Sequence, residues 1–426
     1  MAKKTINKEL TGAQDLYNFL FEACNIIRGP VSQDNFKDYI TPLLYYKRIS
    51  DVYDEETEEA LISSGGDKEY ASLPEQHRFV IPDGCHWQEV RERTENLGAA
   101  IVGAMRQIEI ANPDTLYGVL SMFSSQKWTN KAILNDSKIR DLIEHLSKRK
   151  LGNKDYPADL MGDAYEILLK KFADDSKAQA GEFYTPRSVV RLLVHILDPQ
   201  PGETVYDPAC GSGGMLIEAI RYMHDDSLCC GSIFGQEKNV VNAAIAKMNL
   251  FLHGASDFNV MQGDTLRDPK ILQGGNIAKF DCVIANPPFS LENWGATEWS
   301  SDKYKRNIYG TPSDSCGDYA WIQHMICSMS SGKGRMAVVM PQGILFRGNQ
   351  EAEIRKQLVE SDLIEAVVTL GDKLFYGTGL SPCFLIIRRM KQAHHSGRIL
   401  MIDGSKILTQ KRAQNILEEN DIDRLY

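Results

Sequence analysis

Residues 204–216 read TVYDPACGSGGML, and this stretch decides the expected fold. Its start predicts a short buried strand that ends at Asp207, because valine and tyrosine favour strands. The glycines that follow let a ligand approach the backbone, and we expect a helix to begin at about Gly214. Any tight strand-to-helix turn also favours glycine, so the glycines alone leave a binding loop and an ordinary turn equally open.

The alternation of strand, turn and helix continues along the chain after about Leu160. Further strands are expected at residues 232–237, 259–263, 280–285, 335–340, 364–370 and 383–388. With residues 204–207 they predict an α/β fold, a single doubly wound sheet of seven strands that are mostly parallel. Ligands of such sheets bind beyond the carboxyl ends of the strands, so the residues that follow each strand are the candidates for a functional site.

An all-helical domain is expected ahead of the sheet, because apolar residues recur at helical spacing from Leu10 to about Lys150. The expected interruptions of its helices are residues 54–59, 63–66 and 74–84, although the acidic run at 54–59 is also compatible with a solvated helix face. Helical patterns return near the end of the chain, at residues 410–417 and 421–426. The expected domains are residues 1–155, residues 156–408 and residues 409–426, the last being the start of a C-terminal helical tail.

Three acidic side chains follow consecutive predicted strands at the ligand edge. A carboxylate at Asp207 suits a ligand with cationic or hydroxyl groups, such as S-adenosylmethionine, better than a pyrophosphate. Glu237 is placed to accept hydrogen bonds from a ribose diol, and Asp264 from an adenine amino group. Each of these acids singly could instead cap the helix that follows it. Their recurrence at three strand ends favours a cofactor site.

The fourth predicted strand runs directly into Asn286-Pro287-Pro288-Phe289. The two prolines end strand pairing and fix the turn at the sheet edge. An aromatic amine is a poor nucleophile because its lone pair is delocalised into the ring. The Asn286 side-chain oxygen and the Pro287 carbonyl can each accept one amino hydrogen and so orient that lone pair toward a methyl donor. Phe289 can stack on the base, although the tetrapeptide alone is equally compatible with an ordinary proline-rich turn.

Together these motifs resemble the amino-methyltransferase fold that uses S-adenosylmethionine, with NPPF as the adenine-N6 form of its catalytic motif. Residues 181–187, GEFYTPR, resemble the segment that precedes this fold in the γ arrangement of DNA methyltransferases. Residues 318–321 (DYAW), 340–348 (MPQGILFRG) and 374–379 (LFYGTG) follow the later motifs of one subgroup. That subgroup is the modification subunit of type I restriction-modification systems, which also carries a helical N-terminal domain. The resemblance spans nearly the whole chain.

The resemblance implies a Rossmann-like methyltransferase sheet, S-adenosylmethionine as cofactor, and direct methyl transfer to an adenine that has left the duplex. The implied cofactor-contacting residues are Phe183, Thr185, Pro186, Asp207, Gly211, Gly213, Glu237, Asp264 and Asn286. The implied catalytic residues are Asn286, Pro287 and Phe289. The implied partners are DNA, one specificity subunit for two copies of this chain, and a restriction and translocase subunit in the larger assembly. The expected location is the cytoplasm, because residues 1–10 are too polar for a signal peptide and no apolar run is long enough for a membrane helix. Members of the family usually continue beyond the position of Tyr426 into further helices.

A long segment between Ser290 and Gly317 interleaves aromatic and basic side chains beside the NPPF turn. Aromatic rings can stack on splayed bases and cations can meet phosphates. We therefore expect contacts with the nucleic-acid strand from Trp294, Lys303, Lys305 and Arg306. The alternative is an ordinary mobile surface loop.

Charge and composition limit what the chain can do alone. The net charge is −9, divided into −4 for residues 1–150 and −5 for the rest, so neither half offers the basic surface that tight independent DNA binding needs. No apolar run is long enough to span a membrane, so no membrane partner is expected. The nine cysteines contain no CxxC pair and no HExxH is present, so no metal site is expected.

Two kinds of alternative function remain open at this stage. One is an N-methyltransferase that acts on another planar amine, such as an RNA base, cytosine N4 or a protein glutamine. The helical N-terminal half and the later motifs favour DNA over these substrates. The other is a non-catalytic subunit that binds the cofactor and only scaffolds a restriction complex. The intact Asn286 and Phe289 weigh against it.

Overall fold

The structure is a computed structural model that describes residues 2–116, 118–120, 125–175, 185–223, 231–255, 257–375, 381–411 and 415–426. The chain divides into two compact units. The first unit comprises Met1–Ala178 with Lys247–Gly254, and the second comprises Gln179–Ala246 with Ala255–Tyr426. Each unit is described by itself.

The first unit is helical, which confirms the expected helical domain. Its longer helices are α1 (Ala2–Ile27), α2 (Lys37–Ser63), α5 (Leu97–Ala111), α8 (Asp136–Leu146) and α9 (Ala158–Asp175). Its shorter helices are η1 (Gln33–Asn35), α3 (Lys68–Ala71), η2 (Pro74–Gln76), α4 (Trp87–Arg91), α6 (Pro113–Leu116) and α7 (Ser125–Thr129). The acidic run at residues 54–59 lies inside α2, so it belongs to a helix and the predicted interruption of the helix there is wrong. Helix α9 begins after the predicted boundary at residue 155 and belongs to the first unit.

Buried charges of α2 hold the segment that follows α8. The Arg48 side chain is 1% exposed and donates hydrogen bonds to the carbonyl oxygens of Leu151 and Tyr156. Asp51 accepts a hydrogen bond from the Leu151 backbone N at 2.6 Å. These bonds satisfy polar groups that burial would otherwise leave unpaired, and they explain why charged residues occupy a buried helix face.

The second unit contains an eight-stranded sheet in the order β10-β8-β9-β7-β6-β1-β2-β3. The strands are β1 (Val205–Asp207), β2 (Ile233–Glu237), β3 (Phe258–Gln262), β6 (Cys282–Ala285), β7 (Arg335–Pro341), β8 (Ile364–Leu370), β9 (Pro382–Arg388) and β10 (Leu400–Gly404). Neighbouring strands are parallel except where β9 pairs with β7 and β8. All seven predicted strands are present, which confirms the α/β class. Strand β10 and a small hairpin of β4 (Leu272–Gln273) and β5 (Asn276–Ile277) were not predicted.

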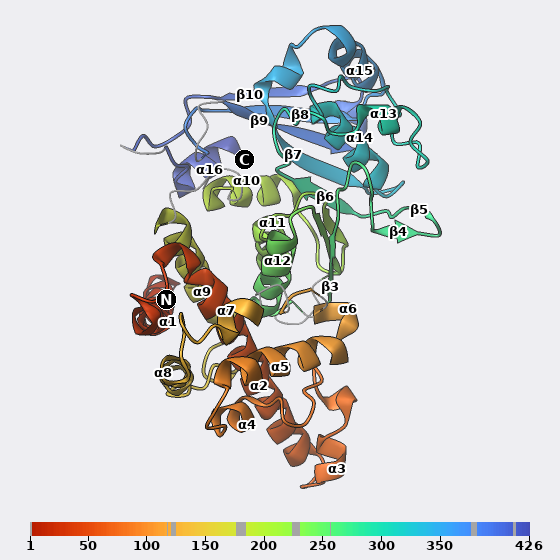
Figure 1. The fold of residues 1–426 in the computed structure, drawn as a ribbon. Helices are drawn as coiled ribbons and strands as arrows, with labels where there is room; N and C mark the ends of the chain where they lie inside the picture. The colour runs from red at the N-terminus through yellow and green to blue at the C-terminus, as the bar shows by residue number, and fades with distance from the viewer. Residues whose placement is uncertain are drawn as a thin grey trace. The chain divides into compact units, whose positions relative to one another are not determined.

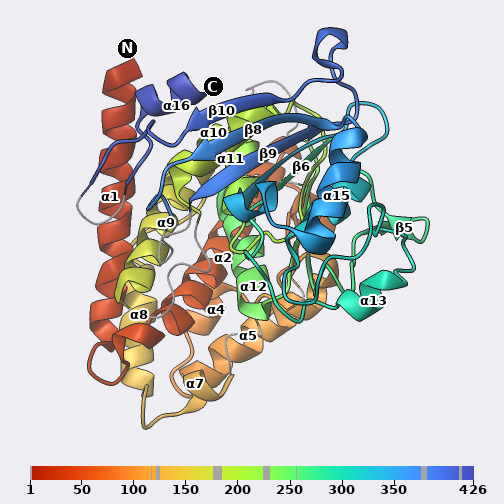
Figure 2. The same ribbon diagram turned by 90° about the horizontal axis from the view of Figure 1, so that it is seen from above.

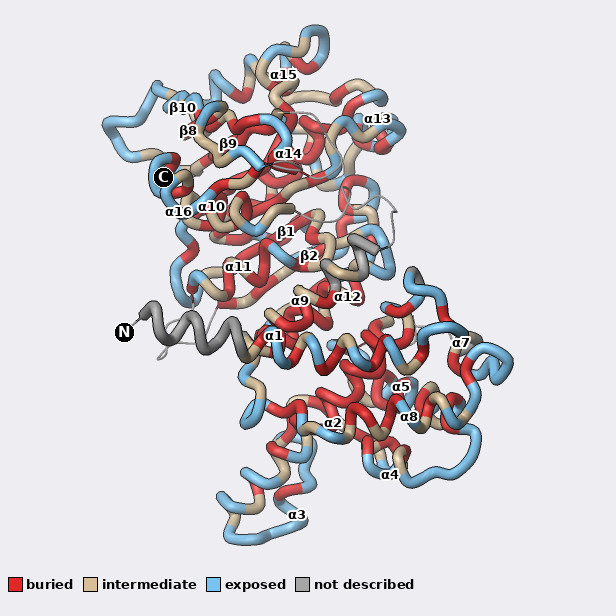
Figure 3. The backbone as a smooth tube through the Cα atoms, turned by 90° about the vertical axis from the view of Figure 1, so that its left-hand side faces the viewer, coloured by how far each residue is buried: buried red, intermediate tan, exposed pale blue. Residues whose placement is uncertain are grey.

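Helices cover both faces of the sheet (Figure 1, Figure 2). Helices α10 (Arg187–Leu197) and α11 (Gly214–Met223) lie on one face, and α14 (Asp318–Ser328) and α15 (Asn349–Glu360) lie on the other. The remaining helices are α12 (Val240–Leu252), α13 (Ala296–Ser300), η3 (Gln342–Leu345), η4 (Ala393–His395) and α16 (Glu419–Leu425). Strands β1, β6 and β7 are buried along their whole length, as Figure 3 shows for β1. Their apolar residues form the core of this unit together with α14 and α15.

The end of the chain differs in part from the prediction. Helix α16 confirms the helical pattern at residues 421–426. The helix expected at residues 410–417 is wrong for the residues of that range that the structure describes, 410–411 and 415–417, which are not helical, and Thr409 and Ile416 face each other in an antiparallel bridge. In the part of the chain that the structure describes, no helix has the length and apolar character needed to cross a membrane.

The sheet order reverses at β1, which lies between β6 and β2. Strands β1, β2, β3, β6 and β7 run parallel, so the residues that follow them gather at one edge of the sheet. Backbone hydrogen bonds join these ends, from Cys210 N to Gln236 O at 3.1 Å and from Gly263 N to Glu237 O at 2.9 Å. This edge is where open parallel sheets bind their ligands.

Candidate active site

Asp207 ends β1 as a buried carboxyl group, only 2% exposed. Its Oδ1 accepts a hydrogen bond from the Ala209 backbone N at 2.9 Å. Burial raises the pKa of Asp207 to about 8; the Ala209 hydrogen bond opposes this rise and the charge of Glu237 adds to it. Such a group ionises at neutral pH only when a cationic or hydrogen-bonding ligand stabilises the carboxylate.

Glu237 links the end of β2 to the glycine turn. Its Oε2 accepts a hydrogen bond from Gly211 N at 3.0 Å, and its Oε1 accepts one from Asn239 N at 2.7 Å. Burial raises the pKa of Glu237, although these backbone hydrogen bonds counteract the rise. Gly211 and Gly213 have φ angles of +53° and +86°, in the left-handed region that favours glycine. The glycines are therefore required by the shape of the turn, whether or not a ligand is bound.

Asp264 caps the turn after β3. Its Oδ1 accepts hydrogen bonds from Leu266 N at 3.2 Å and Arg267 N at 3.3 Å, and its Oδ2 pairs with Lys238 Nζ at 2.8 Å. A turn and not a helix follows Asp264, so it does not fill the helix-capping role that the sequence left open. The predicted contact with an adenine amino group stays a prediction. The neighbouring Thr265 hydroxyl donates to the Pro208 carbonyl at 2.6 Å, which ties this turn to the turn after β1.

The Asn286 side-chain amide makes a hydrogen bond through its nitrogen but none through its oxygen. Its Nδ2 donates a hydrogen bond to Thr185 Oγ1 at 2.8 Å, while its Oδ1 is buried and accepts no hydrogen bond. An unpaired buried acceptor costs about 1 to 3 kcal/mol, and such groups occur where a site awaits a ligand. Thr185 therefore lies against the predicted catalytic amide. Pro186 caps the start of α10 beside it, whereas Phe183 lies outside the described residues.

The ring of Phe289, the last residue of the NPPF turn, lies near a second aromatic ring, that of Phe375. The rings of Phe289 and Phe375 have centroids 6.4 Å apart and an angle of 58° between their planes. Phe289 is half-buried, Phe375 is buried, and Pro287 of the turn is buried as well. Phe375 belongs to the motif at residues 374–379, but its contact with Phe289 was not predicted, since the two residues are far apart in the sequence.

Ser290, the residue that follows the NPPF turn, has a strained backbone and is held by several hydrogen bonds. Ser290 has a φ angle of +50°, which a residue with a side chain rarely adopts. Its backbone N donates to Asp318 Oδ1 at 2.7 Å, and its hydroxyl oxygen accepts from Arg347 Nη2 at 3.0 Å. Arg347 Nη1 pairs with Asp318 Oδ2 at 2.6 Å, and Asp318 is fully buried. Asp318 and Arg347 lie in the later motifs that the sequence showed, but their role in supporting the turn was missed.

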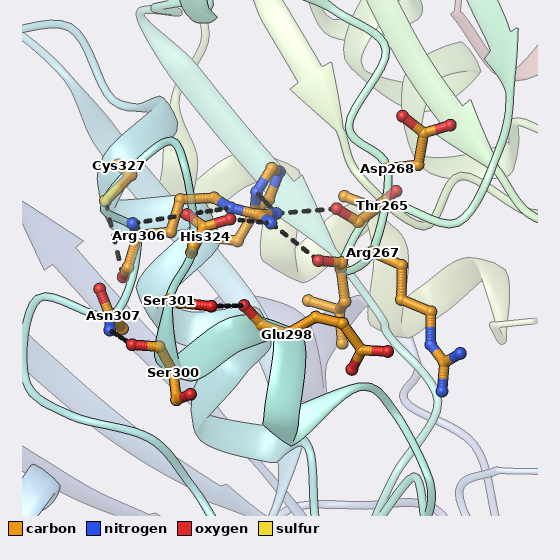
Figure 4. Close-up of polar contacts among 12 residues, drawn as sticks. Thr265, Arg267, Asp268, Glu298, Ser300, Ser301, Arg306, Asn307, His324 and Cys327 are labelled. Atoms are coloured by element: carbon orange, nitrogen blue, oxygen red, sulfur yellow. Dashed lines mark hydrogen bonds and ion pairs between the residues drawn. The ribbon is translucent and has the colours of Figure 1, made fainter.

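The segment between Ser290 and Gly317 is ordered around a buried arginine (Figure 4). Arg306 is 1% exposed and donates to the carbonyl oxygens of Thr265 and Leu266 at 2.8 Å and 2.7 Å. It also pairs with Asp302 at 2.8 Å and contacts His324 Nδ1 at 3.2 Å. Burial, with the charge of Arg306 beside it, lowers the pKa of His324 well below its ordinary value, so this ring is neutral.

The predicted DNA contacts in this segment divide into two groups. Arg306 and Trp294 are buried, Trp294 at 2% exposed, and this burial contradicts the predicted DNA contact of both. Trp294 packs instead against Trp299, with ring centroids 5.6 Å apart. Lys303 and Lys305 are exposed, and their DNA contact stays a prediction.

The residues at this edge fit S-adenosylmethionine. Among the described residues, no cationic side chain pairs with the buried carboxyl group of Asp207. Glu237 presents a second carboxylate to the same turn, and the Asn286 oxygen is unpaired. These acceptors match a ligand that carries positive charge, ribose hydroxyls and a nearby amine. Among the described residues, no group of three or more histidine, cysteine, aspartate or glutamate side chains could hold a metal ion.

Comparison with known proteins identifies the family. A family model of N-6 DNA methylases matches residues 156–426, and a model of the HsdM N-terminal domain matches residues 16–146. The methylase subunit of the type I restriction enzyme MjaVII from Methanocaldococcus jannaschii is 34% identical over 404 residues, which cover 90% of this chain and 67% of that protein. The HindI methylase subunit from Haemophilus influenzae is 33% identical over 300 residues, which cover 70% of this chain and 62% of that protein.

A solved structure shares the architecture of the whole chain. The methyltransferase subunit of a type I restriction-modification system from Streptococcus thermophilus matches with a TM-score of 0.80 at 26% identity, over 97% of this chain and 92% of that chain. The chain therefore belongs to the N-6 DNA methylase family and, within it, to the methylase subunits of type I restriction enzymes.

Proposed function

We propose that this chain transfers the methyl group of S-adenosylmethionine to N6 of an adenine that has left the DNA duplex, as the methylating subunit of a type I restriction-modification complex. The observation that carries the proposal is the buried Asn286 Oδ1, which accepts no hydrogen bond at the end of β6. An acceptor in this position is what the amino group of a base would need. S-adenosylmethionine is the cofactor of this family and supplies an electrophilic methyl group when bound.

The proposed work of the turn is to hold and orient the amino group. The Asn286 oxygen and the Pro287 carbonyl each accept one N6 hydrogen, which turns the nitrogen lone pair toward the methyl donor. Thr185 accepts the hydrogen bond from Asn286 Nδ2, so the amide is held with its oxygen free for the base. Phe289 stacks on the base, with Phe375 behind it.

The cofactor would be held by groups from several strand ends. Asp207 and Glu237 supply carboxylates, Gly211 and Gly213 bring the backbone close, and Asp264 lies at the third strand end. The other proposed contacts come from Phe183, Thr185, Pro186 and Asn286. Neither Asn286 nor Pro287 can take up a proton, so these groups act by holding hydrogen bonds and not as a general base, and the proton that N6 loses on methylation passes to water.

The proposed partners follow from the family. We propose that two copies of this chain work with one specificity subunit, which reads the DNA sequence, and with a restriction and translocase subunit in the larger complex, in the cytoplasm. Residues 1–155 would provide contacts with the partner and with DNA, residues 156–408 would hold the methyltransferase site, and residues 409–426 would begin a helical tail. Exposed Lys303 and Lys305 are the candidates for local DNA contacts.

The test is methyl transfer from tritiated S-adenosylmethionine to unmethylated DNA, RNA or protein, with and without the partner subunits. The wild-type complex should label adenine in DNA. Asn286→Ala should lower the rate by at least about a hundredfold, because it removes the acceptor that activates N6. The matched control is Asn259→Ala, since Asn259 is an exposed residue of β3 away from the turn. Labelling of RNA or protein in place of DNA, or a parental rate for Asn286→Ala, would contradict the proposal.

A further inference from the structure

An exposed phenylalanine lies beside the turn that receives the base. Phe346 is 74% exposed, and it is the one exposed phenylalanine among the residues whose burial the structure describes. We infer that Phe346 is a wedge residue: its ring enters the DNA base stack next to the target adenine and fills the space that the adenine leaves. This inference rests on the proposed function and names a contact with the same substrate.

The topology places Phe346 at the edge of the sheet that carries the site. Strands β6 and β7 are parallel neighbours, with Ala285 opposite Val338. The NPPF turn follows β6, and η3 with Phe346 follows β7, so both segments leave the same edge. The adjacent residue, Arg347, donates a hydrogen bond to the hydroxyl oxygen of Ser290 at 3.0 Å. Phe346 is therefore one residue away from a direct contact with the end of the catalytic turn.

The backbone that carries the ring is firmly held. The Tyr319 hydroxyl donates to the Ile344 carbonyl at 2.7 Å. Arg355 Nη1 donates to the carbonyl oxygens of Ile344 and Arg347 at 3.1 Å and 2.9 Å. The pairing of Arg347 with buried Asp318 joins this corner to the base of the turn. A ring on such a fixed corner loses little conformational freedom when it enters a base stack.

Exposure alone would not single out Phe346, because isolated exposed apolar residues are common on protein surfaces. Met390 provides the comparison, since it is 72% exposed and follows β9. Strand β9 runs antiparallel to β7, so Met390 lies at the opposite edge of the sheet. Phe346 combines exposure with a place beside the base-binding turn. Proteins that unstack DNA use apolar wedges of this kind, and enzymes that modify a base must first remove it from the stack.

The test separates extrusion of the base from methyl transfer itself. The assembled complex would be given a duplex that contains its methylation site, and the same duplex with a mismatch opposite the target adenine. A mismatched base leaves the stack at lower cost, so it needs less help from a wedge. Phe346→Ala should lower kcat/KM on the matched duplex by about tenfold or more relative to the wild type. On the mismatched duplex the same variant should recover most of the wild-type rate. Phe346→Trp should keep the matched rate, because the stacking surface remains.

Met390→Ala is the control and should match the wild type on both duplexes. Cofactor affinity by calorimetry and complex assembly by gel filtration should be unchanged in Phe346→Ala. The inference is overturned if Phe346→Ala methylates the matched duplex at the wild-type rate, if it loses activity equally on both duplexes, or if it fails to assemble, which would indicate a protein contact. Absence of methyl transfer by the wild-type complex on either duplex would instead overturn the proposed function, and the inference with it.

Discussion

At the scale of single residues, the chemistry of the site depends on a carboxyl group kept away from water. Burial raises the pKa of Asp207 to about 8, so in the free protein this group holds a proton at neutral pH. The folded protein then binds one more proton than the unfolded chain between about pH 4 and pH 8. Stability therefore falls as the pH rises through this range, because the unfolded chain releases this proton while the folded protein retains it. A cationic ligand that binds the ionised Asp207 offsets that loss.

The first prediction concerns this proton. Binding of S-adenosylmethionine should release a proton from Asp207, and the affinity should rise by up to about tenfold per pH unit between pH 6 and pH 8. Calorimetry in two buffers of different ionisation enthalpy measures the proton directly. Asp207→Asn should bind more weakly and should lose most of the pH dependence. A proton count of zero in the wild-type protein at pH 7 would contradict the raised pKa.

Residue types at the strand ends could be predicted from the sequence, but their contacts could not. Acidic residues, a glycine turn and the NPPF motif each follow a predicted strand. Their positions predicted that Asp207, Glu237 and Asn286 lie at one edge of the sheet. The bond from Asn286 to Thr185 joins residues about one hundred positions apart, and only the folded chain brings them together. The interleaved aromatic and basic residues led to a wrong prediction of a DNA contact for Arg306. Their composition is the same whether they face solvent or surround a buried ion pair.

At the scale of elements, the segment between β6 and α14 is built like a small core. Trp294 and Trp299 pack with Leu266 and Trp321, and the guanidinium of Arg306 lies 4.5 Å from the Trp299 ring. A segment of this length without long helices is held by its own buried side chains. Its order therefore depends on the interior contacts of Arg306 more than on any contact with DNA.

The second prediction compares two cations of this segment. Arg306→Met should lower the free energy of unfolding by roughly 3 to 5 kcal/mol, because it leaves the Asp302 carboxylate and two carbonyl oxygens without their buried partner. Exposed Lys303→Met should leave the free energy of unfolding close to that of the wild type but should weaken DNA binding by the complex. Urea unfolding followed by tryptophan fluorescence checks the first effect, and a gel-shift assay checks the second. Equal stability of the two variants would refute the buried role of Arg306.

Elements with a strong burial pattern were predictable and those at edges were not. The runs that became β7 and β9 are apolar except for Arg335 and Arg388 at their ends, because both of their faces are covered. Strand β10 has one neighbour, and its Leu400 and Met401 are exposed, so its sequence lacks the regular burial pattern of a strand. Residues 410–417 have helical spacing, yet tertiary pairing of Thr409 with Ile416 overrides it.

At the scale of the whole molecule, the distribution of charge limits what the chain does alone. The net charge of −9 is shared by both halves, so no strongly basic half is available to neutralise a DNA backbone. Local cations such as Lys303 and Lys305 supply only a few phosphate contacts.

The third prediction is that the purified chain binds DNA weakly and without sequence preference, and that it needs the specificity subunit for efficient methylation. A gel-shift assay with a DNA library and S-adenosylmethionine, repeated after addition of the partner, measures this dependence. Tight, sequence-selective binding by the chain in the absence of any partner would refute the prediction.

The position of β9 has a consequence for the synthesis of the protein. Strand β8 pairs with β9 and β10, and both of these strands lie later in the chain. During translation β8 is therefore made before either of its partners, and its apolar residues stay unpaired until β9 has emerged. A truncated chain that ends between residues 371 and 381 would keep β8 as an unpaired apolar strand, which invites chaperone binding or aggregation. Residues up to 388 are needed to cover one side of β8, and residues up to 404 are needed to cover the other.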